Sequence, residues 1–157
     1  MARCRSNAFA FSCVRTTVPD RLLPVFALAA AKARDLSVVG IFANLLHDTL
    51  TTETDLHRAN RRRLRIASHE AASTTTTPIT HAYTRHLLAA AYSGSIAEIV
   101  AAVLPCQLGN AELGAALVPD YRHWAGSPYA DWIRMYSAAE FAAGAEQLRT
   151  GAHYSTS

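Results

Sequence analysis

The chain has 157 residues, which fits one domain, and half of these residues are apolar while 17% are charged. Such a composition indicates a globular protein and excludes an intrinsically disordered one. The formal net charge of +3 is too small to indicate a nucleic-acid partner. No apolar run approaches the ~20 residues that a membrane-spanning helix needs, so we expect no membrane segment.

The three cysteines are Cys4, Cys13 and Cys106, an odd number without the spacing of a metal site. We therefore expect free thiols in a reducing compartment, and hence a cytoplasmic protein. The N-terminus has some basic character, but it lacks the apolar core and the cleavage site of a signal peptide.

Residues 1–19 show little periodicity, so the sequence predicts an irregular N-terminus. A helical domain is expected over residues 20–150. Its first helix is predicted to start at Asp20, as the capping residue, and to run to about Arg34.

A longer helix is predicted from about Leu36 to Leu64. One stripe of it should face the core: Val39, Ala43, Leu46, Leu50, Glu53 and His57. The last two are polar residues on an apolar face. We interpret them as an ordinary helix pair rather than as a metal site or an acid/base pair, because two ligands without a second pair make a poor metal site. The arginines between residues 58 and 65 indicate a solvated helix end.

A polar loop over 68–77 precedes a helix that is predicted to start at Thr80 and to stop at Ser93 and Gly94. The next helix begins with a capping box, in which the Ser95 and Glu98 side chains bond to each other's backbone amides. Its apolar spacing predicts a buried helix that runs to about residue 117.

Pro105 should break this helix, because a proline removes one backbone hydrogen bond and clashes with the preceding turn, at a cost of about 3 kcal/mol or more. Cys106 follows directly, Asn110 lies one turn further on the same face, and Gln107 is nearby. Two interpretations stay open. A buried cysteine commonly packs as a small apolar residue, whereas a nucleophile needs a lowered thiol pKa or a nearby base.

Residues 118–126 are predicted to form a turn, and Ser127-Pro128 to start another helix. An aromatic stripe typical of a core face follows at helical spacing: Tyr129, Trp132, Ile133 and Tyr136. The two tyrosine hydroxyls on this stripe need hydrogen-bond partners or water.

Ser137 and Glu140 form a second predicted capping box, so the helix should restart there and run to about Arg149. Residues 151–157 are predicted to be a tail. No segment alternates convincingly as a strand does, and short connections join successive helices. The sequence therefore predicts an all-α antiparallel helical bundle.

Several motifs of the chain occur together in the order and spacing of one family. Around the cysteine they are Leu104-Pro105-Cys106 and Glu112-x-Gly114, followed by Pro128-Tyr129-x-x-Trp132-Ile133-x-x-Tyr136. Upstream they are Ala82-Tyr83-Thr84-x-x-Leu87 and Glu53-x-x-Leu56-His57. In these motifs the chain resembles the TenA/thiaminase II family, strongly over about residues 78–148 and fairly back to about residue 22.

The resemblance implies a haem-oxygenase-like all-α bundle that usually forms a homotetramer. It implies hydrolysis of small aminopyrimidines derived from thiamine, and of thiamine itself in some members, with no metal or organic cofactor and no nucleic-acid or membrane partner. Cys106 matches the family's nucleophile. Tyr83 and Tyr136 match tyrosines that line the pyrimidine pocket and hydrogen-bond near the thiol.

The chain also departs from the family's pattern. In the family an aspartate holds the pyrimidine, and its position in this chain is occupied by Arg15 or has no equivalent. In the family a glutamate serves as acid/base, and its position would lie beyond Ser157. We therefore expect a bundle that is incomplete at both ends and lacks its last helices. The alternative hypothesis is a non-catalytic or decayed helical module that binds a pyrimidine without turnover. A third hypothesis is a metal site that uses Glu53 and His57.

Overall fold

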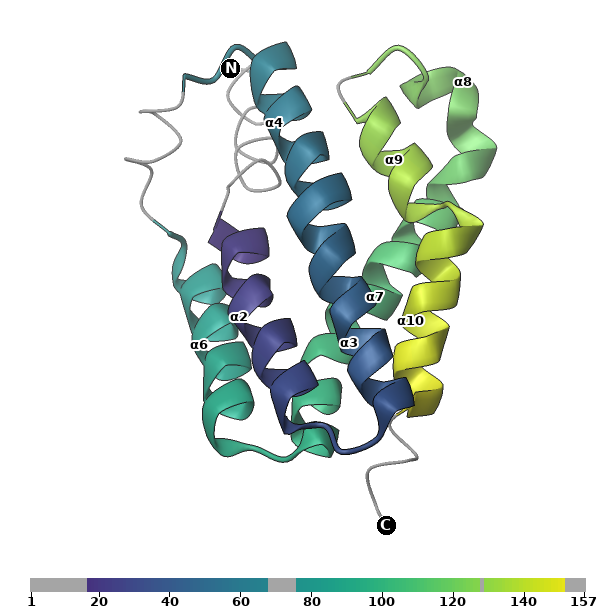
Figure 1. The fold of residues 1–157 in the computed structure, drawn as a ribbon. Coiled ribbons are helices and arrows are strands. Elements are labelled where there is room, and N and C mark those ends of the chain that lie inside the picture. The colour runs from purple at the N-terminus through teal and green to yellow at the C-terminus, as the bar shows by residue number, and fades with distance from the viewer. Residues whose placement is uncertain (1–16, 68–75, 128, 152–157) are drawn as a thin grey trace.

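The computed structural model describes residues 17–67, 76–127 and 129–151, with the backbone alone for residues 17–20, 121 and 124. All regular secondary structure in these ranges is helical, which confirms the predicted all-α bundle (Figure 1). In chain order the segments are α2 (Thr17–Lys32), α3 (Leu36–Asp48), the π-helical turn η1 (Thr49–Glu53), α4 (Thr54–Arg63), α6 (Pro78–Ser93), α7 (Ile96–Leu117), the 3-10 turn η2 (Val118–Asp120), α8 (Tyr121–Trp124), α9 (Ala130–Tyr136) and α10 (Ala139–Gly151).

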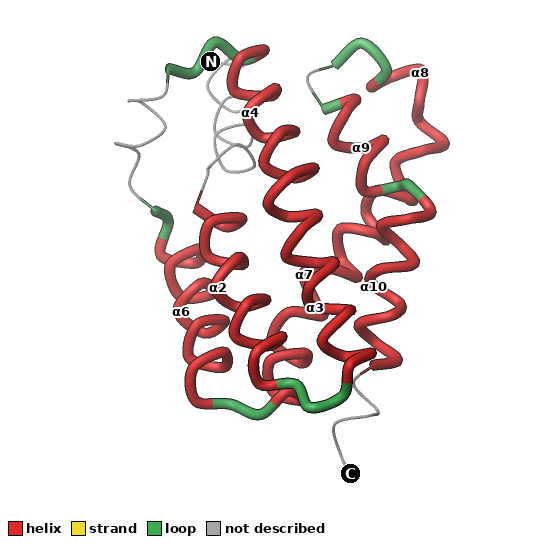
Figure 2. Tube along the Cα trace, viewed as in Figure 1, coloured by secondary structure: helices red, strands yellow, loops and turns green. Residues whose placement is uncertain are grey.

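The segments α3, η1 and α4 form one continuous rod that stands between two groups of helices (Figure 1). On one side α2 packs against α3 and α6, and on the other side α10 packs against α3 and α7. The helix α7 contacts α2, α6, α9 and α10, so it lies at the centre of the bundle. Short loops join α2 to α3 and α6 to α7, which makes these neighbours antiparallel (Figure 2).

The main core lies between α2, α3, α6, α7 and α10 and is entirely apolar. Its buried residues are Leu22, Val25, Phe26, Ala29, Val38, Phe42, Leu87, Ala91, Ile99, Val100, Ala102, Val103 and Leu148. A smaller cluster joins α9 to the end of α7: Ala130 and Ile133, with Leu117, Tyr129 and Trp132 packed against them. Burial of these side chains is the main force that holds the helices together.

The first helix starts earlier than predicted. It begins at Thr17, so Asp20 lies inside the first turn and does not cap the helix. The reason is that Pro19 is tolerated in a first turn, where the missing backbone N–H has no helical partner to lose. Residues 17–19 are therefore helical, and the rest of the segment predicted to be irregular lies outside the described residues.

The predicted helix over 36–64 is continuous, but it contains the π-helical turn η1. A π turn holds one extra residue, so the inward face shifts by one position along the sequence. Up to Thr49, the first residue of the turn, each buried residue is one position earlier than the predicted stripe: Val38 rather than Val39, Phe42 rather than Ala43, and Thr49 rather than Leu50. From Glu53, the last residue of the turn, the prediction is confirmed, because Glu53 and His57 are both buried.

The helix α6 starts at Pro78 rather than at Thr80, because Thr77 caps it and proline suits the first helical position. The Thr77 hydroxyl accepts a hydrogen bond from the backbone N–H of Thr80 at 3.2 Å. The predicted end is confirmed, with Ser93 as the last helical residue and Gly94 as the cap.

The capping box of α7 is confirmed. The backbone N–H of Ser95 donates to Glu98 Oε2 at 2.6 Å, and the N–H of Glu98 donates to Ser95 Oγ at 3.3 Å. The predicted break at Pro105 is wrong, because α7 continues through it to Leu117. Both Pro105 and Ala101, whose carbonyl loses its helical donor, are exposed, so water can bond to that carbonyl oxygen.

The C-terminal region differs from the prediction in two details. The segment predicted as a turn over 118–126 holds the short helices η2 and α8. The helix does restart before α10, but the second capping box is wrong, because the Ser137 hydroxyl donates to the carbonyl oxygen of Arg134 at 3.4 Å instead of capping α10. Since α10 begins at Ala139, Glu140 is in its first turn, and its side chain is exposed.

The sequence predicted no membrane segment, but the helical segment Ile96–Asp120 is long and apolar enough to cross a membrane, by length and composition only. The central helix of a bundle has a similar composition, since most of its faces contact other helices. Ile99 and Val103 on α7 are fully buried within the main core. Since 33% of the apolar window is buried, packing inside the bundle accounts for part of its apolar character.

Candidate active site

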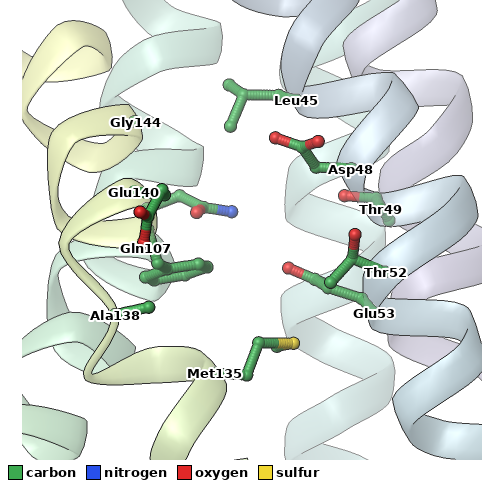
Figure 3. Close-up of a pocket in the computed structure, with 11 residues that line it drawn as sticks. Leu45, Asp48, Thr49, Thr52, Glu53, Gln107, Met135, Ala138, Glu140 and Gly144 are labelled. Carbon is green, nitrogen blue, oxygen red and sulfur yellow. The ribbon is translucent and has the colours of Figure 1, made fainter.

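A cavity of about 280 Å³ separates the rod from α7, α9 and α10 (Figure 3). It is lined by Leu45, Asp48, Thr49, Thr52, Glu53, Gln107, Met135, Ala138, Glu140, Phe141 and Gly144. The end of α3 and the turn η1 supply one wall. Figure 3 shows Gln107 from α7 and Glu140 from α10 on the opposite wall.

Three carboxyl groups line this cavity, at Asp48, Glu53 and Glu140, and its lining contains no lysine, arginine or histidine. Like charges gathered around one space repel one another and favour a proton or a cationic group there. The cavity therefore suits a ligand that is positively charged or rich in N–H donors.

Glu53 is the buried member of this group, with 8% of its surface exposed. Burial, and secondarily the charge of Asp48, raises the pKa of Glu53 to about 7. Near neutral pH this carboxyl group is therefore present in both its protonated and its ionised form. Its position follows from η1, because the extra residue of the π turn places Glu53 on the inward face.

Gln107 is even more deeply buried, at 3% exposed, although it carries a primary amide. Figure 3 shows its amide and the carboxyl group of Glu53 pointing into the cavity from opposite walls. Among the residues that the structure describes, neither side chain has a hydrogen-bond partner. Buried polar groups without partners are rare, and they mark positions where a ligand or water completes the bonding.

Cys106 precedes Gln107 on α7 and is half-buried. Burial, followed by the charge of Glu53, raises the pKa of its thiol, while hydrogen bonds from Tyr83 and Asn110 act in the opposite direction. Asn110 Nδ2 donates to the sulfur at 3.6 Å. Neither Cys106 nor Tyr83 is among the residues that line the cavity, but the neighbour of Cys106, Gln107, is, and the charge of Glu53 acts on the thiol.

Tyr83 comes from α6 and meets Cys106 across the helix interface. Its hydroxyl, which has a single hydrogen, donates to the carbonyl oxygen of Ala102 at 3.4 Å and can donate to the Cys106 thiolate in its place. Burial, followed by the charge of Cys106, raises the pKa of Tyr83, so the hydroxyl keeps its proton and acts as a donor. The structure therefore brings two of the three predicted site residues together.

Tyr136, the third predicted residue, is buried on α9 and packs through its ring. Its ring centroid lies 4.6 Å from that of Trp132 and 4.7 Å from that of Phe141, with which it makes an edge-to-face contact. Phe141 lines the cavity, whereas Tyr136 is not among the lining residues, so it supports this wall through Phe141. Its binding role stays a prediction, as do the roles of Cys106 and Tyr83.

Two further buried polar residues follow Glu53 along the rod, on α4. His57 and Asn60 on α4 are buried, and Asn60 Oδ1 has no hydrogen-bond partner within the described part of the chain. No group of three or more histidine, cysteine, aspartate or glutamate side chains within the described ranges is arranged to hold a metal ion. Glu53 and His57 thus lack the further ligands that a metal site would need.

The sequence predicted a site at Cys106 but gave no part in that site to Gln107, Asp48 or Glu140. One signal for Gln107 was present, namely an amide in a helix that is otherwise apolar. Asp48 and Glu140 carried no such signal, because both are exposed residues near helix ends. They reach the cavity only because α3 and α10 pack side by side.

Known proteins share both the sequence and the fold of this chain. It is 39% identical over 120 residues to an aminopyrimidine aminohydrolase of Halalkalibacterium halodurans, which covers 74% of this chain and 52% of the relative. It is 34% identical over 116 residues to an aminopyrimidine aminohydrolase of Bacillus subtilis, which covers 70% of this chain and 49% of the relative. The chain therefore spans about half the length of the curated relatives it matches.

A solved structure, the TenA homologue protein from P. horikoshii OT3, superimposes with a TM-score of 0.82 at 25% sequence identity. The match covers 94% of this chain and 69% of that one. The family described as TENA/THI-4/PQQC matches residues 20–153, which is most of the chain. Helical architecture, motif order and sequence similarity lead to one conclusion: the chain belongs to the TENA/THI-4/PQQC family.

Proposed function

We propose that this protein is a hydrolase of aminopyrimidines derived from thiamine, with Cys106 as the nucleophile. The observation that carries the proposal is the Cys106 thiol, which accepts a hydrogen bond from Asn110 and directly precedes Gln107, a residue that lines the acidic cavity together with Glu53. The names of the two curated relatives support the substrate class. An acidic cavity also suits a substrate that carries an amine.

In the proposed reaction the Cys106 thiol gives up its proton and the sulfur bonds to a carbon of the pyrimidine ring. The substituent on the exocyclic methylene then leaves with the electron pair of its bond, as an amine that takes up a proton. Water adds to the methylene carbon, the carbon–sulfur bond breaks, and the thiol regains its proton. One carbon–nitrogen bond is exchanged for one carbon–oxygen bond, and no oxidation or reduction occurs.

Tyr83 and Asn110 have a clear part in this scheme. A nucleophilic cysteine reacts as the thiolate, and both burial and the charge of Glu53 oppose ionisation of Cys106. The hydrogen bonds from Tyr83 and Asn110 offset this opposition, because donors favour the charged form of the sulfur. Protonation of Glu53 removes the repulsion, so this carboxyl group is a suitable acceptor for the thiol proton.

The experiment compares the unmodified chain with Cys106→Ser and with Cys13→Ser, a thiol that has no role in the proposal. Release of ammonia from an aminomethylpyrimidine is measured at pH 7. We expect Cys106→Ser to lower kcat by about 10³-fold or more, because loss of a nucleophile removes the covalent route. Cys13→Ser should keep the original rate. Equal activity of Cys106→Ser and the unmodified chain would exclude Cys106 as the nucleophile.

A second candidate function is pyrimidine binding without turnover. The observation that favours it is the raised pKa of the Cys106 thiol, since a protonated thiol is a weak nucleophile. Under this alternative the unmodified chain and Cys106→Ser bind the aminomethylpyrimidine equally well, and neither releases ammonia. Calorimetric titration of both proteins with the same compound distinguishes the two functions.

A further inference from the structure

The polar side chains of the cavity are divided into an outer and an inner pair. Asp48 and Glu140 are exposed, so water solvates their carboxylates. Glu53 and Gln107 are more than nine-tenths buried and point into the cavity from opposite walls (Figure 3). The outer pair gives the entrance a negative charge, whereas the inner pair offers directed hydrogen bonds.

The inner pair is costly to the fold. Both side chains lose most of their contact with bulk water, and among the described residues only the cavity between them leaves room for hydrogen-bond partners. Replacement by apolar side chains of similar size would remove this cost, so stability alone does not account for a glutamate and a glutamine at these positions. A bound ligand that hydrogen-bonds to both groups does account for them.

The two groups present complementary bonding patterns to a flat nitrogen heterocycle. The amide of Gln107 offers one N–H donor and one carbonyl acceptor side by side. A carboxyl group offers the same pattern when it is protonated and two acceptors when it is ionised. An aminopyrimidine carries an amino donor next to a ring nitrogen that accepts a hydrogen bond or holds a proton, and this edge fits either state.

We propose that Glu53 and Gln107 are the specificity-determining residues of the cavity, and that they bind the amino group and the adjacent ring nitrogen of the pyrimidine. This assignment rests on the proposed function and names the groups that recognise its substrate. The complex then holds one proton between Glu53 and the ring. The ring is oriented before the Cys106 sulfur attacks it, and the acidic entrance attracts the amine that leaves.

The test is a cycle that removes one group from the ligand and one from the protein. The aminomethylpyrimidine and the same compound without its ring amino group are titrated into the unmodified chain, Gln107→Leu and Glu53→Gln. For the unmodified chain, loss of the amino group should raise Kd about tenfold or more. For Gln107→Leu, removal of the ring amino group from the ligand should raise Kd less than threefold, because this variant has already lost the hydrogen bond between residue 107 and that amino group. Glu112→Gln, an exposed position on α7, is the matched control and should behave as the unmodified chain does.

A further measurement starts from the unmodified chain alone and follows Kd with pH. Above pH 7 the complex must take up a proton that the free partners have lost, so the Kd of the unmodified chain should rise about tenfold per pH unit. In Glu53→Gln, whose side chain is isosteric and does not titrate, this dependence should disappear. Circular dichroism spectra confirm that each variant is folded before titration.

The outcomes separate this inference from the function on which it rests. If neither the unmodified chain nor Glu112→Gln binds the aminomethylpyrimidine, the proposed function is wrong and the inference falls with it. If the unmodified chain binds it, but loss of the ring amino group costs the same in all variants and Kd is independent of pH, the inference alone is overturned. A reduced cost in Gln107→Leu together with the proton uptake supports it.

Discussion

The two halves of α7 meet different surroundings. Before Pro105 the helix contributes Ile99, Val100 and Val103 to the main apolar core, between α2, α3, α6 and α10. After Pro105 it carries a thiol and two amides, and Gln107 faces a cavity. The comparison shows that one continuous helix supports two regions, of which the first stabilises the fold and the second leaves bonds for a ligand to complete.

The largest effect should come from the apolar region. Phe26 on α2 is fully buried, and its ring centroid lies 6.5 Å from that of Phe42. We expect Phe26→Ala to lower the free energy of unfolding by about 3–5 kcal/mol, because it removes apolar contacts and leaves a void. Urea unfolding followed by circular dichroism measures this loss.

Phe141→Ala is the matched control at the cavity. Phe141 is only half-buried and already faces an empty space, so its removal enlarges a void that exists rather than creating a new one. We expect it to cost less than half as much as Phe26→Ala. Similar costs for the two substitutions would contradict the distinction between an apolar core and a loosely filled site.

The next effect concerns pH and the buried carboxyl group. The pKa of Glu53 is raised from 4.5 to about 7 in the folded chain, so between these pH values the folded state binds more protons than the unfolded state. Stability should therefore be highest below pH 4.5 as far as this group is concerned, and should fall by on the order of 3 kcal/mol as pH rises to 7. Above pH 7 this contribution is constant.

Unfolding curves at several pH values between 5 and 8 measure this slope. Glu53→Gln does not titrate, so its stability should exceed that of the unmodified chain above pH 7 and vary less across the range. Asp48 is the second cause of the raised pKa, and Asp48→Asn should reduce the slope partially. An unchanged slope in Glu53→Gln would assign the pH dependence to other groups.

The smallest effect sharpens the comparison within α7 itself. A Cβ atom at Gly114 would lie 2.6 Å from the backbone carbonyl carbon of Tyr136, whereas one at Gly109 would have nothing within 4 Å. We expect Gly114→Ala to cost about 1–3 kcal/mol, because α9 must move away from α7. Gly109→Ala should stabilise the helix by up to about 1 kcal/mol. Thermal unfolding of the two variants, which carry the same substitution in one helix, tests the close contact directly.

Local signals predicted several elements well. The Ser95 and Glu98 capping box and the end of α6 at Gly94 are confirmed, because a cap depends on residues within one turn. The inward stripe before Thr49 was wrong by one residue, because it assumed a uniform period across η1. No residue in Thr49–Glu53 signals a π turn by itself.

The candidate site was predictable in part. Motif order pointed to Cys106 and Tyr83, which the structure places in contact across α6 and α7. Pro105 was expected to break the helix, but α7 continues through it. The carbonyl group of Ala101, which loses its helical donor, belongs to an exposed residue, so water can bond to it. Gln107 and Glu53 come from segments more than 50 residues apart, so their meeting across a cavity depends on helix packing.

The amino-acid sequence alone determined the helical class and most helix ends, because these depend on spacing and on contacts within a few residues. Only the tertiary structure decided which face of the α3–α4 rod is buried and which polar groups surround the cavity. The physical reason is that burial is a property of neighbours from other helices. A carboxyl group with an ordinary affinity for protons in water acquires its raised pKa at Glu53 only when α3, α7 and α10 enclose it.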